Sequence, residues 1–94
     1  MKELLEQASA CIEEIEARYN DGDINDKMQL QPARDAAYSE YHRVRRIGLQ
    51  AAYQVTAEDR KEMARIMADI QSAANIQATI GVAVRFAGLL KKIV

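Results

Sequence analysis

Apolar side chains recur at intervals of three and four residues along most of this chain, and that spacing restricts its fold more than any other feature. The interval matches the helical period of about 3.6 residues, so it places the apolar residues along one side of each segment. Strong helix breakers are rare, because the 94 residues include one proline and four glycines. We therefore predict an all-α protein, a small antiparallel helical bundle that forms a single domain over residues 1–94.

Turn-forming and capping residues divide the pattern into helices. Asn20, Asp21 and Gly22 favour a turn. Pro32 suits the first position of a helix, where its missing N–H costs nothing. Thr56, with an acidic residue three positions later, approximates a capping box. The predicted main helices span about residues 2–19, 32–54 and 57–93, with a short helical piece near 24–31.

The last predicted helix is much longer than the others, and its apolar faces change along its length. Met63, Ile66 and Ile70 begin a buried seam. Continued at helical period, the seam passes inward through Gly81 and Gly88, which would let a neighbouring helix approach closely. A new apolar face opens on the side that was polar before residue 76. Something must cover that face.

Three explanations of the new face are open. In the first, the helix breaks near residues 75–78 and redirects the face into the chain's own core. In the second, the helix continues and buries the face against another copy or a partner protein. In the third, the segment lies on a membrane surface with Arg85, Lys91 and Lys92 at the headgroups. We favour the second, because apolar helix surface of this extent usually marks a contact with another molecule.

The predicted function follows from that choice: a non-enzymatic interaction or assembly protein. It is expected to self-associate, or to dock to another helical protein, through a coiled-coil-like contact of its C-terminal helix. The alternative is a membrane-surface-active protein that uses the same basic amphipathic helix. The predicted contact residues are Gly81, Val82, Phe86, Gly88, Leu89, Leu90 and Ile93.

A basic and aromatic face of the 32–54 helix gives a further alternative, a site for nucleic acid or an acidic partner. The competing interpretation, which we favour, is that this face packs on the acidic first helix. Glu13 or Glu16 would then pair with an arginine, and Tyr38, Leu49 and Tyr53 would fill the space between. We do not expect nucleic acid as a partner, since the net charge of the chain is −1. The residues of the face are Arg34, Tyr38, His42, Arg45 and Arg46.

Charge is distributed unevenly along the chain. Residues 1–31 carry a net charge of −5, from eight acidic and three basic residues, and residues 32–94 carry +4, from ten basic and six acidic residues. This asymmetry favours packing of the two parts on each other, or head-to-tail association between copies.

Catalytic and metal-binding chemistry is not expected. The single cysteine, Cys11, and the single histidine fall on different predicted helices, so no Cys–His site is indicated. Cys11 lies on a buried stripe, where a thiol is unreactive. The spacing of Asp21, Asp23 and Asn25 matches the first ligands of a calcium loop, but Asp26 stands where that loop needs glycine. We therefore predict no enzyme activity, no cofactor and no metal.

The sequence predicts a cytoplasmic location. The single cysteine excludes an internal disulfide and fits a reducing compartment. Glutamates interrupt the apolar stretch that a signal peptide would need, although export without a leader stays open. No window reaches the about 20 apolar residues of a membrane-spanning helix.

Overall fold

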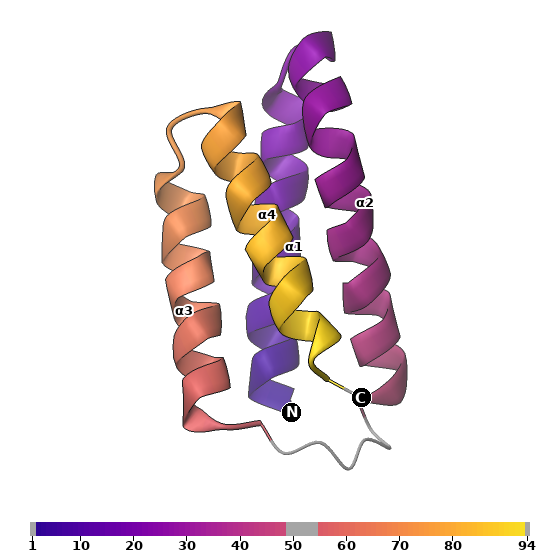
Figure 1. The fold of residues 1–94 in the computed structure, drawn as a ribbon, viewed down its shortest axis with the longest axis vertical. Helices are drawn as coiled ribbons and strands as arrows, with labels where there is room; N and C mark the ends of the chain where they lie inside the picture. The colour runs from indigo at the N-terminus through magenta and orange to yellow at the C-terminus, as the bar shows by residue number, and fades with distance from the viewer. Residues whose placement is uncertain (1, 49–54, 94) are drawn as a thin grey trace.

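The computed structural model describes residues 2–48 and 55–93, and it confirms the predicted all-α bundle. Four helices account for most of these residues, and neither described range contains a strand (Figure 1). The helices are α1 (Lys2–Asp21), α2 (Ile24–Ile47), α3 (Ala57–Ser72) and α4 (Ile76–Lys91).

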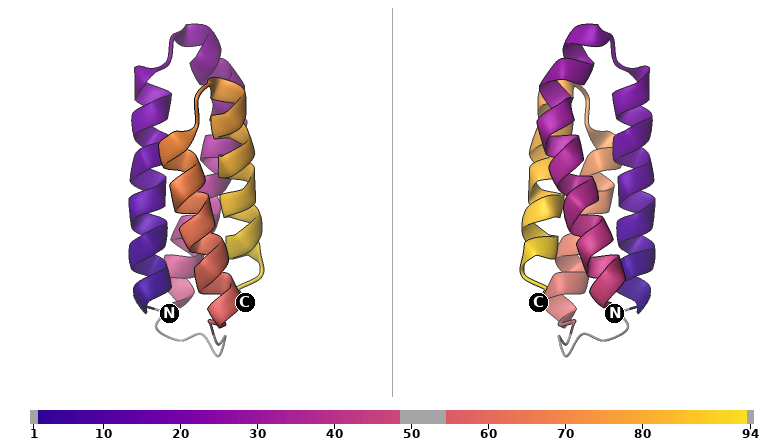
Figure 2. Two further views of the ribbon diagram at one scale, coloured as in Figure 1. Left: turned by 90° about the vertical axis from the view of Figure 1, so that its left-hand side faces the viewer. Right: turned by 90° about the vertical axis from the view of Figure 1, so that its right-hand side faces the viewer.

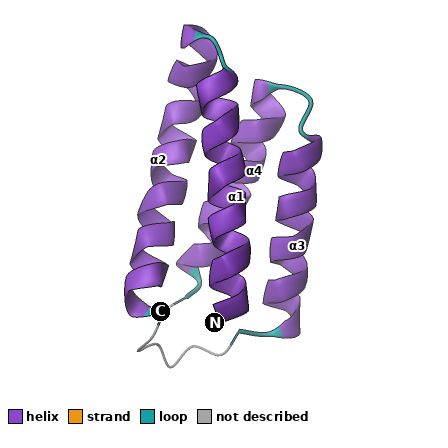
Figure 3. Ribbon diagram, turned by 180° about the vertical axis from the view of Figure 1, so that it is seen from behind, coloured by secondary structure: helices purple, strands orange, loops and turns teal. Residues whose placement is uncertain are grey.

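The helices run alternately up and down the bundle, whose longest dimension is 41 Å (Figure 1). Helix α1 packs beside α2 and α3, and α4 packs beside the same two helices, so α1 and α4 lie on a diagonal (Figure 2). The most extensive contact joins α2 and α4, which are parallel neighbours. The turn between α1 and α2 and the turn between α3 and α4 lie at one end of the bundle. The end of α2 and the end of α4 lie together at the other (Figure 3).

A single core runs between the four helices. The apolar stripe predicted for the first helix is confirmed over the described residues. Five of its members are buried in the core, Leu4, Ala8, Cys11, Ile12 and Ile15, and Leu5 and Tyr19 are partly buried against it. The largest fully buried side chains are Leu4 and Ile15 from α1, Leu30 and Val44 from α2, Met63, Ile66 and Ile70 from α3, and Phe86 and Leu90 from α4, with Ile93 just beyond.

Helix α2 joins two segments that the sequence predicted to be separate, so the predicted start at Pro32 is wrong. The helix begins after Asp23, whose carboxylate accepts a hydrogen bond of 2.8 Å from the backbone N–H of Asp26. Pro32 lies inside the helix and removes the donor to the carbonyl of Met28. Both residues are exposed, so water can satisfy that carbonyl while the buried face of the helix continues.

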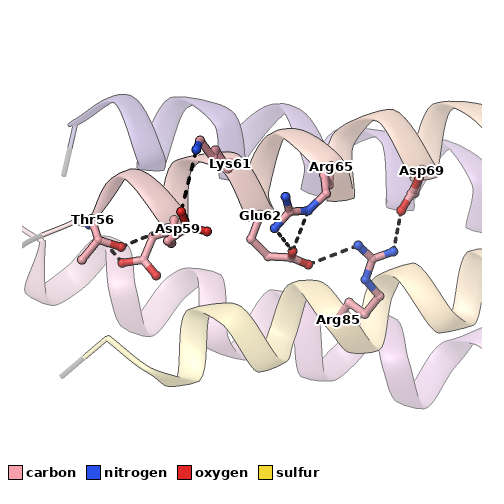
Figure 4. Close-up of polar contacts among 8 residues, drawn as sticks. Thr56, Asp59, Lys61, Glu62, Arg65, Asp69 and Arg85 are labelled. Carbon is pink, nitrogen blue, oxygen red and sulfur yellow. Dashed lines mark hydrogen bonds and ion pairs between the residues drawn. The ribbon is translucent and has the colours of Figure 1, made fainter.

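The other boundaries of the first three helices differ little from prediction. Helix α1 extends two residues beyond residue 19. Helix α2 ends at Ile47, and the predicted extension over residues 49–54 lies outside the described residues. The capping box at the start of α3 is confirmed, because Thr56 Oγ1 accepts from the N–H of Asp59 at 3.0 Å and the Asp59 carboxylate accepts from the N–H of Thr56 at 3.1 Å (Figure 4).

The predicted continuous helix over 57–93 is wrong. The chain instead adopts the alternative, in which a break divides this segment into two helices. Residues 73–75 separate α3 from α4, slightly earlier than the 75–78 expected. The Asn75 side chain caps α4 by accepting a 2.9 Å hydrogen bond from the N–H of Ala78. From α1, the Arg18 guanidinium donates to the carbonyls of Ala73 and, at 3.0 Å, Gln71. Both sides of the break are therefore capped.

Candidate interaction surfaces

The apolar face of α4 is covered by the chain's own helices. Phe86 and Leu90 are fully buried, and the other three apolar contact residues of the prediction are at most 5% exposed. The expectation that another molecule covers this face is corrected accordingly, because α1, α2 and α3 supply the cover. The side chains concerned are Val82, Phe86, Leu89, Leu90 and Ile93.

The outer face of α4 carries the residues that the sequence placed in an inward seam. Gly81 and Gly88 are exposed, and a methyl group added at either would meet no atom within 4 Å. Val84, between them, is 57% exposed. The break at 73–75 explains the reversal, since α4 starts again after the turn and need not keep the phase of the seam in α3. The prediction that the seam continues inward through both glycines is therefore wrong.

Arg85 does not lie free for membrane headgroups, because it joins α4 to α3 (Figure 4). Its guanidinium donates to the carboxylate of Asp69 at 2.5 Å and to that of Glu62 at 3.1 Å. Glu62 also accepts from Arg65 at 2.8 Å. The hydrogen bonds from Arg65 and Arg85 lower the pKa of Glu62 below its ordinary range. These exposed pairs fix the side-by-side position of the two helices but add little stability.

The basic and aromatic face of α2 is partly used inside the molecule. Arg34 forms a bidentate pair with Glu16 of α1, at 2.7 and 3.0 Å, as the favoured interpretation of this face predicted. The guanidinium also lies over the rings of Tyr19, at 4.6 Å, and Tyr38, at 4.9 Å. Hydrogen bonding from Arg34 lowers the pKa of Glu16, and burial raises the pKa of Tyr38. Arg34 and Tyr38 are thus structural residues.

The remaining predicted residues of that face stay exposed. The His42 ring lies 5.8 Å from that of Tyr38 and 5.7 Å from that of Tyr41. Arg45 and Arg46 project from the last turns of α2, and neither pairs with an acid among residues 2–48 and 55–93. They therefore remain available to another molecule.

Lys91 and Lys92 lie at the same end of the bundle as these two arginines. Arg43 of α2 holds the end of α4 in place, because its guanidinium donates to the carbonyls of Ile93, at 2.7 Å, and Leu90, at 2.9 Å. Both lysines are exposed, and neither forms an ion pair within the described part of the chain. We call Arg45, Arg46, Lys91 and Lys92 the basic end.

Two exposed apolar residues in the first turns of α2 were missed by the sequence reasoning. Ile24 is 80% exposed and Met28 is 69% exposed. They are four residues apart and so adjacent on one side of the helix, opposite the buried Leu30 and Ala37. Counted along one continuous helix over residues 24–47, the helical period places Ile24 and Met28 on the side opposite the buried residues. The predicted helix start at Pro32 hid this relation, because it assigned the two residues to a separate segment.

The described residues include one cysteine, which is buried, and no candidate metal cluster. Cys11 is fully buried, and burial, with a smaller contribution from Glu14, raises the pKa of its thiol to about 12. Such a thiol is a poor nucleophile at neutral pH. No group of three His, Cys, Asp or Glu side chains is arranged to bind a metal within the described ranges. Nor is any described helix both long and apolar enough to span a bilayer.

Comparisons with protein-family models, curated proteins and solved structures gave no match. The surfaces described above are therefore the basis for a functional proposal.

Proposed function

We propose that this chain is a non-enzymatic assembly protein that self-associates. The exposure of Ile24 and Met28 carries the proposal. Two large apolar side chains stand next to each other on a regular helix and remain largely in water, whereas among the other described large apolar side chains only Val84 is exposed to a comparable degree. Apolar surface that a folded protein leaves open next to charged residues is typical of a contact site.

The proposal keeps the predicted class of function but places the contact surface on α2 instead of the C-terminal helix. The sequence placed the contact on the C-terminal helix, but Phe86 and its neighbours are buried within the bundle. The membrane alternative needs the same buried side chains, so it loses its apolar anchor. The nucleic-acid alternative loses Arg34 and Tyr38, which pack on α1. Self-association through α2 uses only side chains that are exposed.

Light scattering coupled to gel filtration tests the proposal. At about 100 μM we expect an average mass above the 10.6 kDa of one chain, rising with concentration. Met28→Asp should return the protein to the monomer, because a charge placed in an apolar contact is costly to bury. Ala64→Asp, on an exposed position of α3, adds the same charge elsewhere and should have no effect. A monomer at every concentration would reject self-association.

A further inference from the structure

The turn between α1 and α2 and the C-terminal ends of α2 and α4 carry opposite charge. At one end, the segment from Asn20 to Lys27 contains three aspartates and one lysine, a net charge of −2. Asp21 and Asp23 are exposed there, directly before the exposed Ile24. We call Asp21, Asp23, Ile24 and Met28 the acidic end. It combines negative charge with the most exposed large apolar side chains of the described residues.

The basic end lies at the opposite pole, where the parallel helices α2 and α4 both finish (Figure 1). Its four basic side chains are exposed and unpaired among the described residues. Half-buried Ile47 and Val55 at the same pole, with the aliphatic stems of the arginines and lysines, provide apolar surface. The basic end can therefore complement the acidic end, because it offers the opposite charge and apolar surface of its own.

One molecule cannot bring its own two ends together. Helix α2 carries Ile24 in its first turn and Arg45 and Arg46 in its last, and its 24 residues extend over about 36 Å. The bundle is 41 Å long in all. In an assembly made only of this chain, a second copy must therefore present the basic end that meets an exposed acidic end.

We infer that copies of this chain associate head to tail, with the acidic end of one seated on the basic end of the next. The inference rests on the proposed self-association and names the surface that receives Ile24 and Met28. A second copy matches both ends at once, whereas a polyanion such as nucleic acid would match only the basic end. Because the two contacting surfaces differ, every dimer keeps one free end of each kind, and assembly continues into chains or rings.

A mixing experiment tests this arrangement. Met28→Ala damages only the acidic end and adds no charge that the basic end could attract, and we expect the dissociation constant to rise about thirtyfold, the loss typical of one buried apolar anchor. Arg45→Gln/Arg46→Gln damages only the basic end and should weaken association about tenfold. Each variant alone should be largely monomeric, at a concentration where the unaltered protein is associated. Their equimolar mixture should form a dimer of about twice 10.6 kDa and nothing larger, because each variant contributes one intact end.

The controls separate the inference from the proposed function. Lys61→Gln/Arg65→Gln removes the same charge from exposed positions of α3, a helix that does not contact α2, and should leave association unchanged. Added salt should weaken head-to-tail association, since partly exposed charges are screened. Circular dichroism confirms that each variant is folded.

If the unaltered protein associates but Arg45→Gln/Arg46→Gln associates equally well, or the mixture stays monomeric, the head-to-tail arrangement is wrong and self-association still holds. A monomeric unaltered protein refutes both.

Discussion

Replacing Phe86 by alanine is the sharpest test of where the C-terminal helix buries its apolar face. Phe86 is fully enclosed by the chain's own core, so its truncation should leave a cavity as well as remove buried apolar surface. Such replacements cost about 3–5 kcal/mol. A domain of this length has a total free energy of unfolding of only about 5–14 kcal/mol. Phe86→Ala should therefore leave a protein at the margin of folding.

The assay is urea denaturation followed by circular dichroism, at several protein concentrations. If Phe86 is buried within one chain, the loss should be the same at every concentration, because Phe86 contacts no second copy and association would stabilise both proteins equally. Val84→Ala provides the matched control on the same helix: Val84 is 57% exposed, and its truncation should change stability by no more than about 0.5 kcal/mol. A loss below about 1 kcal/mol for Phe86→Ala, or one that appears only at high concentration, would refute the intramolecular core.

Three further predictions concern the helix ends, the exposed glycines and the Glu16–Arg34 pair. Asn75→Ala removes the cap of α4 and should cost about 1 kcal/mol in urea denaturation; no loss would mean that Arg18 alone sets the break. Gly81→Ala should raise stability by about 0.5–1 kcal/mol, because space is open at that site and alanine favours the helix; destabilisation would show that the site is enclosed. Arg34 lowers the pKa of Glu16 below its ordinary 4.5, so the pair's stabilisation is present above that pH and lost as pH falls through the lowered pKa. Glu16→Gln should flatten that part of the dependence of the urea midpoint on pH, and an unchanged profile would contradict the pairing.

Much of the fold could be predicted because it depends on local pattern. The three-four spacing placed Leu4, Cys11 and Ile15 in the core, and the Thr56–Asp59 box set the start of α3. The break at 73–75 could not be derived in the same way. It contains no proline or glycine, and one of its two capping side chains comes from Arg18, which lies 55 residues away in sequence from Ala73.

The candidate site was harder to predict because it depends on which side of each helix faces the core. Val82 and Phe86 were correctly identified as an apolar face that needs cover, but the pattern alone does not say whether the cover is the same molecule. Pro32 caused a second error, a predicted helix start that the structure does not have. Its preference for the first turn of a helix is real, yet the capping box at Asp23 and the continuous buried face of α2 outweigh it, and the boundary it suggested hid the exposed Ile24.

The contact between Arg18 and the carbonyls of Gln71 and Ala73 also bears on how the protein is made. Helix α1 is synthesised long before the turn that its arginine caps, so the capping group is available when that turn leaves the ribosome. A C-terminal half made alone would lack this group, and two backbone carbonyls at the end of α3 would lose their partner. The first helix thus supplies a capping group for the turn that leads into the last helix.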